Sequence, residues 1–206
     1  MNDRQLQTVF IVDDDEAVRD SITELLESVG LVAQAYDSAA AFLEGYEPDR
    51  SGCLVLDVRM AEMSGLVLQQ RLKEMETSLP IVMITGHGDV PMAVEAMRNG
   101  ALDFIQKPYR DQALLDSINC ALSQQADRDR TSALDEQFEH RLATLTGREM
   151  EIFECIRCGD SSKEIARKLA ISPRTVETHR HNLLHKLKVA SVKDLLLLLA
   201  ARKSGN

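Results

Sequence analysis

Several apolar segments in the first half of this chain run directly into a carboxylate, a hydroxyl or an amino group. Short apolar segments rich in β-branched residues are typical of strands. In an open parallel α/β sheet, ligands bind beyond the carboxyl ends of the strands, so we expect these polar groups to converge on one site. The segments and the residues that follow them are Val9-Phe10-Ile11-Val12 with Asp13-Asp14-Asp15, Cys53-Leu54-Val55-Leu56 with Asp57, Ile81-Val82-Met83-Ile84 with Thr85, and Asp103-Phe104-Ile105-Gln106 with Lys107-Pro108.

The chemistry that this set of groups predicts is phosphoryl transfer. Three carboxylates that lie close together cannot all stay ionised without a cation. Oxygen ligands suit a hard ion such as Mg2+, with Mn2+ as its substitute. Asp57 is the candidate nucleophile, because it stands alone at the end of the central strand, where an attacking oxygen would be most exposed. Asp13 and Asp14 would hold Mg2+, which neutralises charge on a transferring phosphoryl group. Lys107 and the Thr85 hydroxyl would contact phosphoryl oxygens.

Two other interpretations of these residues compete with a phosphoryl-transfer site. A single aspartate after a strand is an ordinary turn former, but the same placement at several strand ends indicates a site. A flavodoxin-like FMN site would need the loop after the first strand to cradle a phosphate, which the acidic run at 13–15 would repel. A P-loop is excluded, because the chain contains no Gly-Lys pair.

The elements that must position these groups alternate between strand and helix. This rhythm predicts five right-handed βα units that form a doubly wound parallel α/β sheet of the flavodoxin-like type, with strand order 2-1-3-4-5. Strands are predicted at 8–12, 31–36, 52–57, 80–85 and 103–106, with helices at 16–29, 38–45, 65–75, 90–99 and 111–124.

The last third of the chain contains helical patterns alone. Two capping boxes begin at Thr146 and Ser161, and Ser172-Pro173 places an N-cap before a proline at the first helical position. Four helices are therefore predicted, at 147–158, 162–169, 173–187 and 191–202. The second and third are joined tightly, as in a helix-turn-helix. The predicted organisation is an α/β domain at 1–124, a helical linker at 125–141 that continues the fifth helix, and a four-helix domain at 142–206.

Composition supports two domains with different partners. The net charge of -9 is made up of -12 over residues 1–123, -3 over 124–140 and +6 over 141–206. The basic last part suggests contact with nucleic acid. No long apolar run and no signal-like amino terminus occur, so we expect no membrane association and a cytoplasmic location. Cys155 and Cys158 have zinc-type spacing without a second pair, so we interpret them as a buried residue and a helix-end residue.

Residues 8–123 resemble the receiver domain of two-component response regulators. The resemblance rests on Asp13-Asp14, Asp57, Thr85 and Lys107-Pro108, and the segments Gly86–Pro91 and Asp57–Met60 resemble the FixJ branch. It implies that Asp57 is the phosphoacceptor and that Asp14, Asp57 and the backbone carbonyl of Arg59 ligate Mg2+, with Asp13 acting through water. Thr85 and Phe104 would form the switch pair.

Two further residues of the acidic domain bear on this resemblance. Ala61 stands where the family usually has proline, and we expect it to loosen the loop after the phosphoacceptor. His87 could act as a base in principle, but receivers of this branch carry it without using it as a nucleophile.

The third helix of the basic domain has an apolar stripe and a polar face that suits the major groove. Together with its neighbours it resembles the LuxR/NarL-type DNA-binding domain from 142 to 199. By that resemblance Glu177, Thr178 and His181 read base edges. The candidates for phosphate contacts are Lys163, Arg174, Thr175, Arg180 and Lys186. Val192 replaces an arginine that many family members carry, so one backbone contact is expected to be missing.

The resemblances together imply a FixJ-type response regulator. A sensor histidine kinase would donate a phosphoryl group to Asp57, and phosphorylation would control promoter DNA binding and transcription, with RNA polymerase as a further partner and a homodimer as the phosphorylated state. The only enzymatic activity expected is Mg2+-dependent phosphorylation and dephosphorylation of the receiver itself. Two alternatives are a metal-dependent phosphatase, which would need an acid/base pair that the sequence does not offer, and a phosphorylation-independent DNA binder, against which the intact acidic set argues.

Overall fold

The computed structural model describes residues 7–47, 50–86 and 90–203. Its contacts divide the chain into two compact units, Met1–Asp129 and Arg130–Asn206. Each unit is described by itself below. Within the described residues, none of the helices combines the length and the apolar composition that a membrane span requires.

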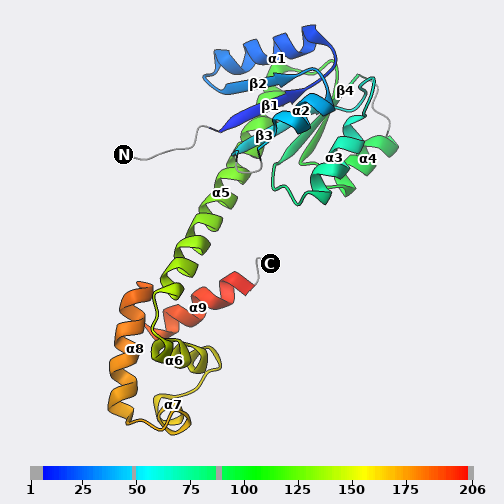
Figure 1. Ribbon diagram of the computed structural model, residues 1–206. Helices are drawn as coiled ribbons and strands as arrows, with labels where there is room; N and C mark the ends of the chain where they lie inside the picture. The colour runs from blue at the N-terminus through cyan, green and yellow to red at the C-terminus, as the bar shows by residue number, and fades with distance from the viewer. Residues whose placement is uncertain (1–6, 48–49, 87–89, 204–206) are drawn as a thin grey trace. The chain divides into compact units, whose positions relative to one another are not determined.

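The first unit is a five-stranded parallel sheet with helices on both faces (Figure 1). The order β2-β1-β3-β4-β5 confirms the predicted fold class and strand order. The strands are β1 (Thr8–Val12), β2 (Val32–Tyr36), β3 (Gly52–Asp57), β4 (Ile81–Thr85) and β5 (Asp103–Gln106). The helices are α1 (Glu16–Ser28), α2 (Ala39–Gly45), α3 (Gly65–Glu74), α4 (Val90–Arg98) and the first part of α5 (Asp111–Ala143).

Alternate residues of each strand supply two separate cores. On one face, Phe10, Leu54 and Met83 pack with residues of α2, α3 and α4. On the other face, Val9 and Val55 pack with residues of α1 and α5. Strands β1, β3 and β4 are buried on both faces, which explains their nearly continuous apolar sequences. The polar residues that end these strands therefore meet at one edge of the sheet.

Glycine is required at one point close to that edge. A Cβ atom on Gly65 would lie 2.2 Å from the backbone carbonyl oxygen of Asp57. The backbone of α3 can therefore approach the end of β3 only because Gly65 has no side chain. Its N–H also donates to the carbonyl oxygen of Val58 at 3.0 Å, which closes the loop between β3 and α3.

Helix α5 continues without a break through residues 125–141, the predicted linker. Residues 125–129 of that linker pack on the first unit. Asp129 accepts hydrogen bonds from the Ser51 hydroxyl at 2.5 Å and from the Gln125 side chain at 2.8 Å. Arg128 donates to the carbonyl oxygen of Ser78 at 2.6 Å. The boundary between the two compact units therefore falls within α5, between Asp129 and Arg130.

The second unit is helical and confirms the four predicted helices with shifts of one residue at some ends. They are α6 (Gly147–Arg157), α7 (Ser162–Lys168), α8 (Pro173–Leu187) and α9 (Val192–Lys203). Both predicted capping boxes are present, and the Ser172 hydroxyl accepts from the N–H of Thr175. One residue of the predicted linker, Phe138, belongs to the core of this unit. Its ring is buried in the core of this unit, with the Arg202 guanidinium 4.5 Å from its centre.

Candidate functional site

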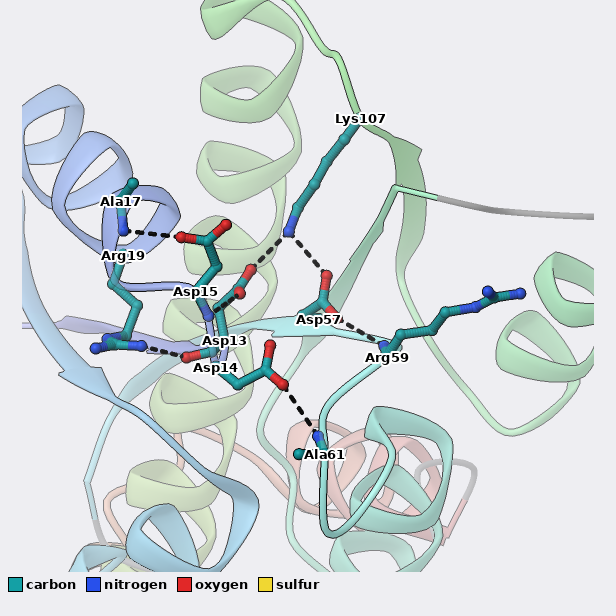
Figure 2. Close-up of polar contacts among 9 residues, drawn as sticks. All are labelled: Asp13, Asp14, Asp15, Ala17, Arg19, Asp57, Arg59, Ala61 and Lys107. Carbon is teal, nitrogen blue, oxygen red and sulfur yellow. Dashed lines mark hydrogen bonds and ion pairs between the residues drawn. The ribbon is translucent and has the colours of Figure 1, made fainter.

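Three predicted site residues meet at the carboxyl edge of the sheet (Figure 2). The Lys107 ammonium Nζ lies 2.6 Å from a carboxylate oxygen of Asp13 and 2.8 Å from one of Asp57. Asp13 follows β1, Asp57 ends β3 and Lys107 follows β5. One cation therefore bridges two carboxylates that are far apart in sequence.

This group is largely covered from solvent. Asp13 is 1% exposed and Asp57 4% exposed, so the expectation that Asp57 would present the most exposed oxygen is wrong for this structure. Lys107 binds one oxygen of this carboxyl group, and the backbone N–H of Arg59, in the loop after β3, binds the other. Burial raises the pKa of Asp57 above its ordinary value, although the hydrogen bond from Lys107 opposes this. Burial alone would lower the pKa of Lys107, but its hydrogen bonds to both carboxylates leave that pKa raised.

Asp14 lies beside this group but does not bind Lys107. Its side chain is exposed, and one carboxylate oxygen accepts a hydrogen bond from the backbone N–H of Ala61 at 3.0 Å. Arg59, whose carbonyl was predicted to be a metal ligand, donates its N–H to Asp57 at 2.6 Å. In the part of the chain that the structure describes, no three acidic, histidine or cysteine side chains are close enough to hold a metal ion.

The predicted switch residues flank this edge on neighbouring strands. Thr85 is fully buried at the end of β4, and its carbonyl oxygen accepts from the N–H of Lys107 at 2.7 Å. Phe104 on β5 is partly buried and packs against the core that lies under α4. Thr85 is therefore linked through the backbone to the segment that carries Lys107. His87 lies outside the described residues.

Two positioning contacts were missed by the sequence analysis. Arg19 on α1 donates to the backbone carbonyl oxygen of Asp13 at 2.8 Å. Asp15, which belongs to the acidic run at 13–15, is the N-cap of α1 and accepts from the N–H of Ala17 at 3.0 Å. An aspartate immediately before a helical pattern is an N-cap signal, so Asp15 could have been recognised. No local pattern indicates the bond of Arg19.

In the second unit, the polar face of α8 is exposed as predicted. Arg174, Glu177, Thr178 and His181 are exposed, and so is Lys163 on α7. The apolar stripe, including Val176, Leu183 and Leu187, is buried against the other helices. These exposed groups occupy the second helix of a helix-turn-helix and its predecessor, where donors and acceptors can reach a DNA groove.

Three other predicted DNA-contact residues have partners within the unit. The hydroxyl groups of Thr175 and Ser172 lie 2.8 Å apart. Arg180 contacts the Ser162 hydroxyl and lies 3.3 Å from Glu177. Lys186 lies 2.6 Å from Glu149. Their roles as phosphate contacts stay predictions, since each would have to share or exchange these partners.

We expect Glu149 to stabilise the folded state of the second unit. It is 4% exposed, pairs with Lys186 and closes the capping box at Thr146. Burial alone would raise its pKa, but hydrogen bonds from Lys186 and Thr146 hold that pKa below its ordinary value. Glu149→Ala should destabilise the unit by about 1–3 kcal/mol in thermal unfolding, because it removes the carboxylate that pairs with Lys186 and caps the helix end.

Glu154→Ala on the same helix is the matched control, because Glu154 pairs with Arg157 and both side chains are about half exposed. A lowered pKa means that the ionised form of Glu149 stabilises the fold. The difference in free energy of unfolding between the wild type and Glu149→Ala should therefore shrink as the pH falls through that pKa. Equal losses from both substitutions would rule out this role.

The structure also places Cys155, Cys158 and Val192, for which the sequence predicted specific positions or roles. Cys158 ends α6 as predicted, whereas Cys155 is only partly buried. Both thiols are free.

Val192 is the first residue of α9 and packs, partly buried, against the core of the unit. Its apolar side chain therefore contributes to packing there, and the missing backbone contact to DNA stays a prediction.

Comparison with known proteins matches each of the two units to a separate domain family. The chain matches the response regulator receiver domain family over residues 9–119 and the family of bacterial regulatory proteins of the luxR family over residues 143–199. It is 42% identical to the response regulator protein TodT of Pseudomonas putida over 200 residues, which cover 95% of this chain and 86% of TodT. It is 44% identical to the transcriptional regulatory protein FixJ of Azorhizobium caulinodans over 188 residues, which cover 91% of this chain and 89% of FixJ.

Solved structures give the same result. The response regulator StyR is 44% identical with a TM-score of 0.83, and the alignment covers 95% of this chain and 98% of StyR. Full-length FixJ from B. japonicum is 40% identical with a TM-score of 0.57, and the alignment covers 93% of this chain and 95% of that one. The chain therefore belongs to the response regulators that join a receiver domain to a LuxR-family DNA-binding domain.

Proposed function

We propose that this response regulator accepts a phosphoryl group on Asp57 from a sensor histidine kinase and that phosphorylation controls its binding to promoter DNA. The observation that carries the proposal is the bridge from Lys107 to Asp13 and Asp57 at the carboxyl edge of the sheet. In this reaction a carboxylate oxygen of Asp57 attacks phosphorus, the bond to the kinase histidine nitrogen breaks, and Lys107 pairs with a phosphoryl oxygen. The receiver would act as an enzyme only on itself, in phosphorylation and dephosphorylation.

The receiver also needs a second cation, because two buried carboxylates share the single charge of Lys107. The adjacent Asp14 adds a third carboxylate. Two carboxylates and a backbone carbonyl oxygen form an all-oxygen donor set that suits Mg2+, or Mn2+ in its place, and this set does not require three side chains to meet at one point. Asp14, Asp57 and the carbonyl oxygen of Arg59 would hold the ion, with Asp13 acting through water. When bound, the metal ion neutralises charge on the transferring phosphoryl group.

Thr85 and Phe104 are the proposed switch residues. Thr85 lies buried at the end of β4, close in the fold to the segment of Lys107, so its hydroxyl could turn toward a phosphoryl oxygen on Asp57. That movement would vacate space for Phe104, which is only partly buried on the next strand. An inward rotation of Phe104 would change the surface formed by α4 and β5.

We further propose three functional parts, with the receiver at 1–124, the helical linker at 125–141 and the DNA-binding domain at 142–206. Promoter DNA is the partner of the last part, RNA polymerase is a further partner, and the cytoplasm is the proposed location. Glu177, Thr178 and His181 would read base edges. Lys163, Arg174, Thr175, Arg180 and Lys186 would contact phosphates.

DNA binding provides a test of these assignments. Lys163→Ala should weaken binding to all sequences alike and reduce the slope of log affinity against log salt by about one, because one phosphate contact is lost. His181→Ala should instead cost about 1–3 kcal/mol on the preferred site and change which site is preferred. Fluorescence anisotropy over a range of salt concentrations measures both effects.

Lys73→Ala is the charge-matched control, since Lys73 is an exposed lysine of the first unit. It should leave affinity and salt slope unchanged. If Lys163→Ala and His181→Ala had the same effect on specific and random DNA, the division into phosphate contacts and base contacts would be wrong.

A further inference from the structure

The backbone N–H of Ala61 makes a contact that the proposed phosphorylation chemistry does not use. It donates to a carboxylate oxygen of Asp14 at 3.0 Å, across 47 positions of the sequence. We propose that this N–H is a positioning group, which holds the Asp14 carboxylate in the orientation that binds the divalent cation. The inference rests on the proposed function, because it assumes that Asp14 is a metal ligand.

The side chain of Asp14 has few other contacts that would fix its orientation. Unlike its buried neighbour Asp13, it is exposed and has no bond to Lys107. An exposed side chain loses rotamer entropy when it is fixed by a ligand. A carboxylate has two oxygens, so a donor on one of them leaves the other available. Figure 2 shows the second oxygen of Asp14 on the side of Asp13 and Asp57, while the first points to Ala61.

The loop that supplies this N–H is itself fixed to the site. Arg59, two positions before Ala61, donates its N–H to Asp57 at 2.6 Å. Gly65 closes the same loop through its bond to the carbonyl oxygen of Val58 at 3.0 Å. Two alternate N–H groups of one loop therefore hold two carboxylates that come from different strands. Hydrogen bonds of this kind to ligating carboxylates orient them and support metal affinity.

This contact depends on the residue at position 61. Proline has no N–H and could not donate to Asp14, whereas alanine can. The expectation that Ala61 loosens the loop therefore omitted a compensating bond. Its N–H ties the loop after the phosphoacceptor to the loop after β1.

Magnesium titration by calorimetry, without any phosphodonor, tests the inference on the full chain. Ala61→Pro removes the N–H and should weaken Mg2+ binding about 10-fold, at the lower end of the range for lost supporting hydrogen bonds to metal ligands. Ala61→Ser keeps the N–H and should restore wild-type affinity. In the Asp14→Asn background, Ala61→Pro should have no additional effect, because the two changes act through one carboxylate.

A second variant guards against disturbance of the loop by the proline ring. Replacing Ala61 by lactic acid converts its N–H to an ester oxygen and keeps the methyl group, and it should weaken Mg2+ binding as Ala61→Pro does. Unchanged Mg2+ affinity in both Ala61→Pro and the lactic acid protein would overturn the inference. Tighter Mg2+ binding would also overturn it, because it would show that the N–H competes with the ion. Absence of Mg2+ binding by the wild type would instead contradict the proposed metal site itself.

Discussion

Asp57→Asn is expected to abolish covalent labelling of this protein by a small phosphodonor in the presence of Mg2+. The wild type should gain one acyl phosphate that is stable in acid and labile in base. The amide of the variant has no anionic oxygen to attack phosphorus, although its side chain has almost the same shape as that of Asp57. We do not expect the neighbouring carboxylates to replace it, because Asp13 and Asp14 are the residues proposed to serve the metal ion. Intact mass under acidic conditions measures the label.

Asp37→Asn is a matched control. Asp37 also follows a strand, β2, but it is exposed and its carboxylate accepts a hydrogen bond from the neighbouring Ser38 hydroxyl. This variant should be labelled like the wild type. Stoichiometric labelling of Asp57→Asn that matched the wild type would place the acceptor at another residue.

Phosphorylation is also expected to convert the protein from a monomer to a dimer. A helix-turn-helix of this size covers one half-site, so tight binding requires two copies. The surface of α4 is suited to the contact, because Val90 is 77% exposed, Val94 42% and Met97 48%. Phe104 lies on the adjacent strand β5, so its rotation would change this surface. A coupling free energy of about 1–3 kcal/mol, roughly 5- to 150-fold in the dimerisation constant, is the expected size.

Sedimentation of the unmodified and phosphorylated forms at matched concentrations measures this coupling. Val94→Glu should prevent phosphorylation-dependent dimerisation without preventing labelling, because it places a charge in the proposed contact. Val67→Glu, at a similarly exposed valine of α3, is the control and should dimerise normally. Identical monomer–dimer constants for the two forms of the wild type would mean that activation works by releasing an inhibited DNA-binding domain.

The fold could be predicted because its signals are local. Strand ends, capping boxes and the Ser172-Pro173 start follow from residue type and spacing within a few positions, and the structure has them where they were expected. The meeting of Asp13, Asp57 and Lys107 follows from the same reasoning, since the carboxyl ends of parallel strands share one edge.

The partners of individual side chains could not be predicted in the same way. Periodicity shows which face of α8 is polar, but it does not show that Lys186 turns to Glu149 or that Arg180 reaches Ser162. The bond from Ala61 to Asp14 involves a backbone group, for which residue type carries almost no signal. The burial of Asp57 could not be predicted from its place at a strand end, because a neighbouring loop and Lys107 cover it.

The central claim is that phosphorylation of Asp57 controls DNA binding, and the affinity for a promoter site tests it most directly. Footprinting across the genome with and without phosphodonor would identify such a site. At constant salt, phosphodonor and Mg2+ should raise the affinity of the wild type by about 5- to 150-fold and leave that of Asp57→Asn unchanged. Equal affinities of the phosphorylated and unmodified wild type, or an equal rise for Asp57→Asn, would contradict the account.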